Sequence, residues 1–140
     1  MNQSIVITGA TGGLGASLAA AYAAPGIALL LIGRDEARLG EVASAATKAG
    51  ADVATALVDV RDRQAMASTL CAFDDTHPVT LLIVNAGVTS GLRADGVDPA
   101  SRRQIEVNLI GAFNTAEPLI PRMSKRKTGQ IALVSSLAAL

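Results

Sequence analysis

Short apolar segments alternate along the chain with longer segments of helical spacing. Five segments are almost continuously apolar and span 4–7, 27–32, 53–60, 81–84 and 131–134, the third less regularly than the others. Strands that are buried on both faces have this composition, because helices cover a parallel sheet on both sides. The pattern therefore predicts five strands of a parallel sheet.

The segments between these strands have the spacing of helices that bury one face. Helices are expected over 14–24, 35–49, 62–73 and 98–123. The first would end at Pro25-Gly26 and the second at Gly50, while Asp62 is a candidate N-cap of the third. The fourth is the longest and should bend or end near its prolines. Those prolines are Pro118 and Pro121, and its predicted core face carries Ile105, Leu109, Ala112 and Ala116.

Strands and helices alternate in the order that produces a doubly wound α/β sheet with right-handed crossovers. We expect one Rossmann-type domain over residues 1–140, with its strands in the order 3-2-1-4-5 and the chain truncated after the fifth strand. The sequence contains no internal repeat, low-complexity segment or linker.

The charge balance argues against a nucleic-acid partner. Twelve basic and twelve acidic side chains give a formal net charge of zero, whereas nucleic-acid surfaces show a strong basic excess. The local basic run Lys125-Arg126-Lys127 is interpreted as a solvated helix end. Aromatic side chains, on which single-stranded bases stack, are restricted to Tyr22, Phe73 and Phe113.

A single cysteine, Cys71, excludes an internal disulfide and fits a reducing compartment. It lies in an apolar helical segment, where a buried structural thiol is expected. No apolar run reaches the roughly 18 residues of a membrane span, and the start MNQSIVITG lacks the basic region of a signal peptide. The sequence predicts a cytoplasmic protein without a membrane partner.

A glycine-rich turn follows the first strand and opens the first helix, where residues 8–15 read Thr-Gly-Ala-Thr-Gly-Gly-Leu-Gly. A turn this tight needs positions without a Cβ, and Gly15 would let the helix pack close to the strand. The start of a helix presents N–H groups and the positive end of its dipole to a phosphate. Glycines between a strand and a helix predict a dinucleotide site. A plain glycine-rich connection is the alternative.

The turn resembles that of the short-chain dehydrogenases/reductases. Their single-domain branch carries Thr-Gly-x-x-x-Gly-x-Gly, matched by Thr8, Gly9, Gly13 and Gly15. The extended, epimerase-like branch carries Gly-x-x-Gly-x-x-Gly, which Gly9, Gly12 and Gly15 match as well, so the turn does not separate the branches.

Four further segments resemble the single-domain branch. Residues 85–87 (Asn-Ala-Gly) are similar to the motif that braces the sheet beside the cofactor, and 58–60 (Val-Asp-Val) end the third strand where relatives place an Asp against the adenine. Asn108 matches the active-site asparagine that anchors a water of the proton relay, and Ser136 matches the catalytic serine. The resemblance implies a cofactor site of Gly9, Thr11, Gly12, Gly13, Leu14, Gly15, Arg34, Asp59, Val60, Asn85, Ala86 and Gly87, with catalytic roles for Asn108 and Ser136.

Each of these segments also has a simpler structural interpretation. Asp59 would serve as a cap or turn residue, Asn85 as a turn residue, and Asn108 as a hydrogen-bonded polar group in an apolar helix stripe. Ser135 and Ser136 would be ordinary loop residues. The resemblance is specific because five motifs follow one another in the family's order along the whole chain.

The end of the second strand favours NADP(H) over NAD(H). Relatives that use NAD place an acid there, which accepts hydrogen bonds from the ribose 2′-hydroxyl, whereas this chain reads Gly33-Arg34-Asp35. A guanidinium group binds a 2′-phosphate through two hydrogen bonds. Asp35 is expected to cap the next helix, with contact to the ribose or pairing with Arg34 as alternatives.

The resemblance implies hydride transfer between a nicotinamide and a small-molecule carbonyl or alcohol substrate. In relatives, a serine holds the substrate oxygen and a tyrosine exchanges its proton. The lysine of a Tyr-x-x-x-Lys motif lowers the pKa of that phenol, which is about 10 when unperturbed. Here the position of that tyrosine falls beyond Leu140, and Tyr22 lies in the first helix with no lysine after it. We interpret the chain as the N-terminal part of such an enzyme.

A non-catalytic module that binds a dinucleotide is the alternative function. An extended-branch epimerase or redox-sensor domain is a weaker one, against which the motif at 85–87 and Asn108 argue. The substrate is not readable, because relatives form their substrate loop after a sixth strand, although segment 88–98 is a candidate for one wall.

We also expect a homo-oligomer. The strand at 131–134 would form an apolar edge without an outer neighbour, and such edges recruit partners. In relatives, the helix that follows the long helix completes a subunit interface.

We expect negligible reductase activity from these 140 residues, because they hold no Tyr-x-x-x-Lys motif. The rate of NADPH oxidation with a panel of aldehydes and ketones measures this. Turnover at the rate of intact relatives would contradict the expectation, and NADPH binding by the same sample is the control for a folded chain.

Overall fold

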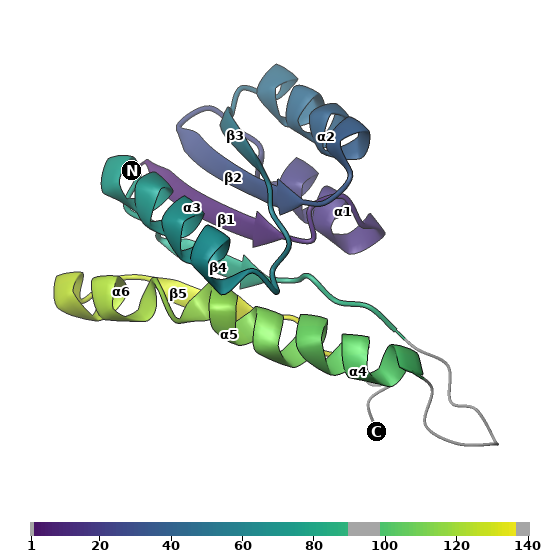
Figure 1. Cartoon of the computed structure of the whole chain (residues 1–140). Coiled ribbons are helices and arrows are strands. Elements are labelled where there is room, and N and C mark those ends of the chain that lie inside the picture. Colours follow the sequence, from purple (N-terminus) through teal and green to yellow (C-terminus); the bar gives the residue numbers. More distant parts are fainter. Residues whose placement is uncertain (1, 90–98, 137–140) are drawn as a thin grey trace.

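A computed structural model of the chain describes residues 2–89 and 99–136. Its strands form one parallel sheet in the order β3-β2-β1-β4-β5, as predicted (Figure 1). The strands are β1 (Gln3–Thr8), β2 (Ile27–Gly33), β3 (Asp52–Leu57), β4 (Leu81–Val84) and β5 (Gln130–Leu133). The helices are α1 (Gly13–Tyr22), α2 (Glu36–Lys48), α3 (Arg63–Thr76), α4 (Pro99–Ile105), the π-helical turn η1 (Glu106–Ile110), α5 (Gly111–Ala116) and α6 (Ile120–Arg126).

The central strands are buried on both faces, because consecutive side chains point into two separate cores. Ile5 and Ile7 of β1 pack with side chains of β2, α1 and α2. Val6 of β1 packs instead with Met66 and Leu70 of α3 and with side chains from η1 to α6. This two-sided burial explains why the sequence of these strands is continuously apolar.

The third strand is shorter than predicted and is not buried on both faces. It ends at Leu57 rather than at Val60, because its partner β2 ends at Gly33. One further hydrogen bond joins the Val58 N–H to the Gly33 carbonyl at 3.2 Å. β3 is an edge strand, and Leu57 is exposed. Residues 58–60 therefore form a loop after the strand.

The predicted fourth helix is interrupted, and half of its predicted core face is wrong. Ala112 and Ala116 pack against the core, but Ile105 and Leu109 are 58% and 53% exposed. The π-helical turn η1 contains Leu109 and separates Ile105 from Ala112 and Ala116. Its extra residue rotates the following helix relative to the preceding one. A turn before α6, next to Pro118 and Pro121, ends α5 as expected. The predicted start at Asp98 lies outside the described residues.

Side-chain caps start two helices where the sequence predicted them. Asp35 accepts a hydrogen bond from the Arg38 N–H at 3.1 Å, and Asp62 accepts one from the Ala65 N–H at 3.0 Å.

Cys71 is a free, half-buried thiol of α3 rather than a fully buried one. Within residues 2–89 and 99–136, no helix has the length and hydropathy needed to cross a membrane.

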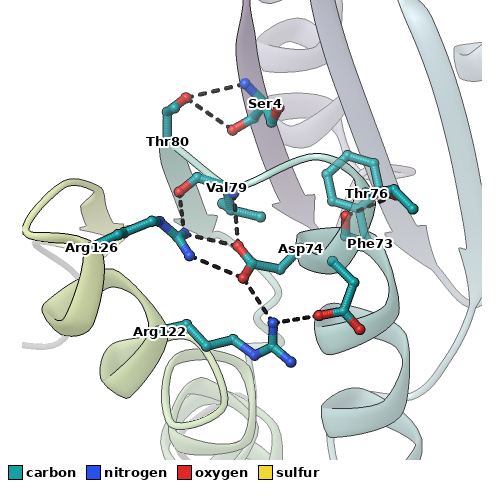
Figure 2. A network of polar contacts seen from close by, with 9 residues as sticks. Ser4, Phe73, Asp74, Thr76, Val79, Thr80, Arg122 and Arg126 are labelled. Carbon is teal, nitrogen blue, oxygen red and sulfur yellow. Dashed lines mark hydrogen bonds and ion pairs between the residues drawn. The ribbon is translucent and has the colours of Figure 1, made fainter.

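A buried ion-pair network fastens α6 to α3 (Figure 2). The side chain of Asp74 is 3% exposed, and Arg126 donates to its two oxygens at 2.8 and 3.0 Å. Arg122 and the Val79 N–H also donate to it, at 3.1 and 2.8 Å. The basic run at 125–127 ends a helix as predicted, and Lys125 and Lys127 are exposed. Its central arginine differs, because Arg126 is half-buried in this network.

The network makes the stability of the fold depend on pH. Burial alone would raise the pKa of Asp74, but the hydrogen bonds from Arg126, the Val79 N–H and Arg122 outweigh it and hold the pKa below its ordinary value of 3.8. The contribution of the ionised carboxylate is therefore present above about pH 4. It is lost as the pH falls through the lower, folded-state pKa.

Asp74→Asn should lower the free energy of unfolding at pH 7 by about 3 kcal/mol, because it leaves two arginines without their buried anion. Asp75→Asn is the matched control: Asp75 is the exposed neighbour and also pairs with Arg122, at 2.7 Å. We expect that control to cost less than about 1 kcal/mol. Urea denaturation of both variants measures the difference, and equal losses would contradict a dominant role for the buried carboxylate.

Candidate functional site

A cleft of about 380 Å³ opens at the carboxyl ends of β1, β2 and β4. The chain leaves β1 toward β2 on one side and returns through α3 to β4 on the other, so the strand order reverses between β1 and β4. Open α/β sheets bind ligands at such a reversal. The cleft is lined by Gly9, Thr11, Gly12, Leu14, Gly15, Ile32, Gly33, Arg34, Asp35, Val58, Asp59, Val60, Asn85, Ala86, Gly87, Val88 and Val107.

Two glycines of the turn are required by close backbone approaches. Gly9 has a φ of +64°, and a Cβ there would lie 2.8 Å from the Cα of Ala86. A Cβ at Gly15 would overlap the carbonyl oxygen of Gly9. Gly13 differs, because a Cβ there would meet no atom within 4 Å, and this residue does not line the cleft. The turn therefore needs its first and last glycines for space, but not Gly13.

Thr8 and Asn85 join the glycine turn to the end of β4. The hydroxyl of Thr8 accepts hydrogen bonds from the N–H groups of Asn85 and Ala86 at 3.0 and 3.1 Å. The amide of Asn85 donates to the carbonyls of Thr8 and Gly9 at 3.1 and 3.2 Å. Thr8 matches the motif in sequence, but its role in joining the two loops was not predicted; its place directly before the first glycine was the available signal.

A group of charged residues closes the end of the cleft beyond β2 and β3. The Arg34 side chain is 50% exposed, and its Nη1 atom lies 3.9 Å from an oxygen of Asp59. Hydrogen bonds from Arg61 lower the pKa of Asp59 to about 2, so its carboxylate is ionised at neutral pH. A Cβ at Gly33 would lie 2.8 Å from the Cγ2 atom of Thr11, so an acid at that position would require this threonine side chain to move.

The two predicted catalytic residues lie outside the cleft lining, among the residues described. Asn108 belongs to η1, and its side-chain amide accepts from the Val88 N–H and donates to the Val88 carbonyl, both at 2.8 Å. It thus fixes the chain that follows β4. Ser136 is exposed and follows the end of β5. Ser90, Arg93 and Asp95 of the candidate substrate wall lie outside the described residues.

Sequence reasoning missed several groups that shape the cleft. Ile32 and Val107 line it, but apolar residues in strands and helices carry no distinctive signal. Arg61 was missed although it follows Asp59 by two residues, because only tertiary structure shows which partner a surface arginine takes. The described residues contain no group of three or more histidine, cysteine or acidic side chains suited to a metal ion.

The chain belongs to the short chain dehydrogenase family, whose model matches residues 3–140. It is 34% identical to a 3-dehydrosphinganine reductase (TSC10B) of Arabidopsis thaliana, over 97% of this chain and 42% of that protein. A crystal structure of a metagenomic short-chain oxidoreductase in complex with NADP superposes with a TM-score of 0.89 at 30% identity, covering 99% of this chain and 64% of the other.

A second solved structure, carveol dehydrogenase from Mycobacterium avium in complex with NAD, has a TM-score of 0.84 at 28% identity. The match covers 96% of this chain and 55% of that protein. The chain thus spans about half the length of the relatives that it matches. The family is one of oxidoreductases that bind nicotinamide dinucleotides.

Gly15→Ala should destabilise the fold by about 3 kcal/mol, because the new methyl group overlaps a backbone oxygen that cannot move freely. Gly13→Ala is the matched control in the same turn of α1, where alanine has open space and a better helix propensity. Its free energy of unfolding should stay within about 1 kcal/mol of the original, or rise. Urea denaturation of the pair tests the difference, which would be absent if the two glycines were equivalent.

Proposed function

We propose that these residues form the cofactor-binding part of an NADP(H)-dependent oxidoreductase that transfers hydride between a nicotinamide and a carbonyl or alcohol. The observation that carries the proposal is the juxtaposition of a glycine-rich turn with an exposed guanidinium group in one cleft. The glycine turn suits a pyrophosphate, and Arg34 suits a second anion at the ribose.

The cleft fits a dinucleotide in shape and charge. Gly9 and Gly15 leave the backbone bare on the side where α1 begins, and the first turn of α1 holds no acidic residue. Its free N–H groups and positive dipole end therefore favour a phosphate. Asp59 and Val60 line the far end of the cleft, where an adenine would lie in this proposal.

The preference for NADP(H) rests on the end of β2. The two similar structures hold different cofactors, NADP in one and NAD in the other, so they do not decide the question. In this chain Gly33 has no side chain that could reach the ribose, and Asp35 caps α2. Arg34 is then the residue best placed for the ribose, and its charge favours a 2′-phosphate.

When bound, the nicotinamide supplies the hydride-transfer chemistry. In this proposal Asn108 orders the chain after β4 through its paired hydrogen bonds to Val88, and Ser136 holds the substrate oxygen. Tyr22 is excluded as the proton donor, because it packs against the core on the α1 face of the sheet. This observation keeps a second candidate open, in which the chain binds the dinucleotide without catalysis.

Arg34→Gln should weaken NADP⁺ binding about 10- to 100-fold, the value of charge-assisted hydrogen bonds to a phosphate. NAD⁺ binding should change less than about threefold, because it lacks the 2′-phosphate. Isothermal titration calorimetry of both dinucleotides measures the ratio of the two dissociation constants.

Arg63→Gln is the matched control. Arg63 forms an ion pair with Glu117, with an N···O distance of 2.9 Å, and neither residue lines the cleft. It should change neither dissociation constant. Failure of the original chain to bind either dinucleotide would overturn the proposed function, and equal binding of both would overturn the preference for NADP(H).

A further inference from the structure

Both carboxylate oxygens of Asp59 are held by Arg61, a residue that does not line the cleft. The Arg61 Nε atom lies 3.1 Å from each oxygen, and its Nη2 atom lies 2.7 Å from Oδ2. The Arg61 backbone N–H donates to Oδ1 at 2.9 Å. These hydrogen bonds from Arg61 to Asp59, called the Arg61 clamp below, turn the carboxylate toward Arg61. They leave only a longer contact, of 3.9 Å, to Arg34.

Asp59 therefore lies between two guanidinium groups that compete for it. Arg34 faces the cleft and is the group proposed to bind a 2′-phosphate, whereas Arg61 faces away toward Glu106, at 3.6 Å. A free Asp59 carboxylate would compete with a phosphate for Arg34, and it would also repel the phosphate. The Arg61 clamp opposes both effects, because it neutralises the carboxylate from the side opposite the cleft.

The position of Arg61 is imposed by the helix that packs beneath it. Asn114 of α5 is buried, and its side-chain amide donates to the carbonyls of Val60 and Arg61 at 2.9 and 3.2 Å. Gly111 allows this approach, because a Cβ there would lie 2.5 Å from Val60. The loop that carries the clamp is thus held by the core rather than by surface contacts alone.

We propose that Arg61 is a positioning residue that sets the preference for 2′-phosphorylated cofactors, by holding the Asp59 carboxylate away from Arg34. This inference rests on the proposed function of the cleft. It assigns part of the cofactor preference to a residue that does not contact the cofactor.

The test uses two ligands that differ only in the group concerned, adenosine 2′,5′-bisphosphate and adenosine 5′-monophosphate. Titration of the ¹⁵N-labelled 140-residue chain, followed by its backbone amide signals, yields both dissociation constants. Arg61→Gln should weaken binding of the bisphosphate about fivefold, the effect of one exposed charge pair. Binding of the monophosphate should stay within about twofold, because it lacks the second phosphate.

The double variant Asp59→Asn with Arg61→Gln separates this role from a merely structural one. It removes the carboxylate together with its clamp, so Arg34 is again available and the ratio of the two dissociation constants should return to that of the original chain. Arg63→Gln should leave the ratio unchanged throughout. If Arg61 had a structural role only, Arg61→Gln would weaken the binding of both ligands equally, and the double variant would not restore it.

The outcomes distinguish the inference from the function on which it rests. If the original chain binds neither ligand, the proposed function fails and the inference fails with it. If the original chain prefers the bisphosphate and Arg34→Gln abolishes that preference but Arg61→Gln does not, only the inference is overturned. The inference alone is also overturned if Arg61→Gln leaves the ratio of the two dissociation constants unchanged. The same holds if the double variant does not recover the preference for the bisphosphate.

Discussion

The close contact between the ends of β1 and β4 is the constraint on which the rest of the cleft depends. Gly9 lies so near Ala86 that a side chain cannot be placed between them, and the Thr8 hydroxyl binds two consecutive N–H groups after β4. These contacts hold two loops together that are 76 or more residues apart in sequence. The cleft is a consequence, because α1 must then begin beside the loop after β4.

Charge organises the other end of the cleft in a comparable way. An isolated carboxylate beside a guanidinium group would pair with it and compete with an anionic ligand for that group. In this chain Asp59 has a second cationic partner on its outer side, and the loop between them is anchored by Asn114 from below. The same contact therefore serves stability and the proposed specificity. The hydrogen bond from Asn114 orders the loop, and the ordered loop sets the direction of the Asp59 carboxylate.

The helices on the α3 face are held by polar contacts as well as by apolar packing. Asp74 ties α3 to α6, while the π-helical turn carries Asn108 toward Val88. The extra residue of that turn also explains the exposed apolar side chains of Ile105 and Leu109. The helical segment that positions Asn108 thus also exposes an apolar surface.

The sequence by itself determined the strand segments, the aspartate caps and the place of the glycine turn, because each depends on a local pattern: apolar runs, an Asp at a helix start, and glycine between strand and helix. The strand order was predicted from the regular alternation of strands and helices, which favours a doubly wound sheet. Only the tertiary structure decided which glycines are required, where β3 ends and which residue holds Asp59. These depend on atoms brought together from distant segments, such as Gly33 beside Thr11 or Arg126 beside Asp74. A linear pattern records the type of a residue, whereas its partner is chosen by packing.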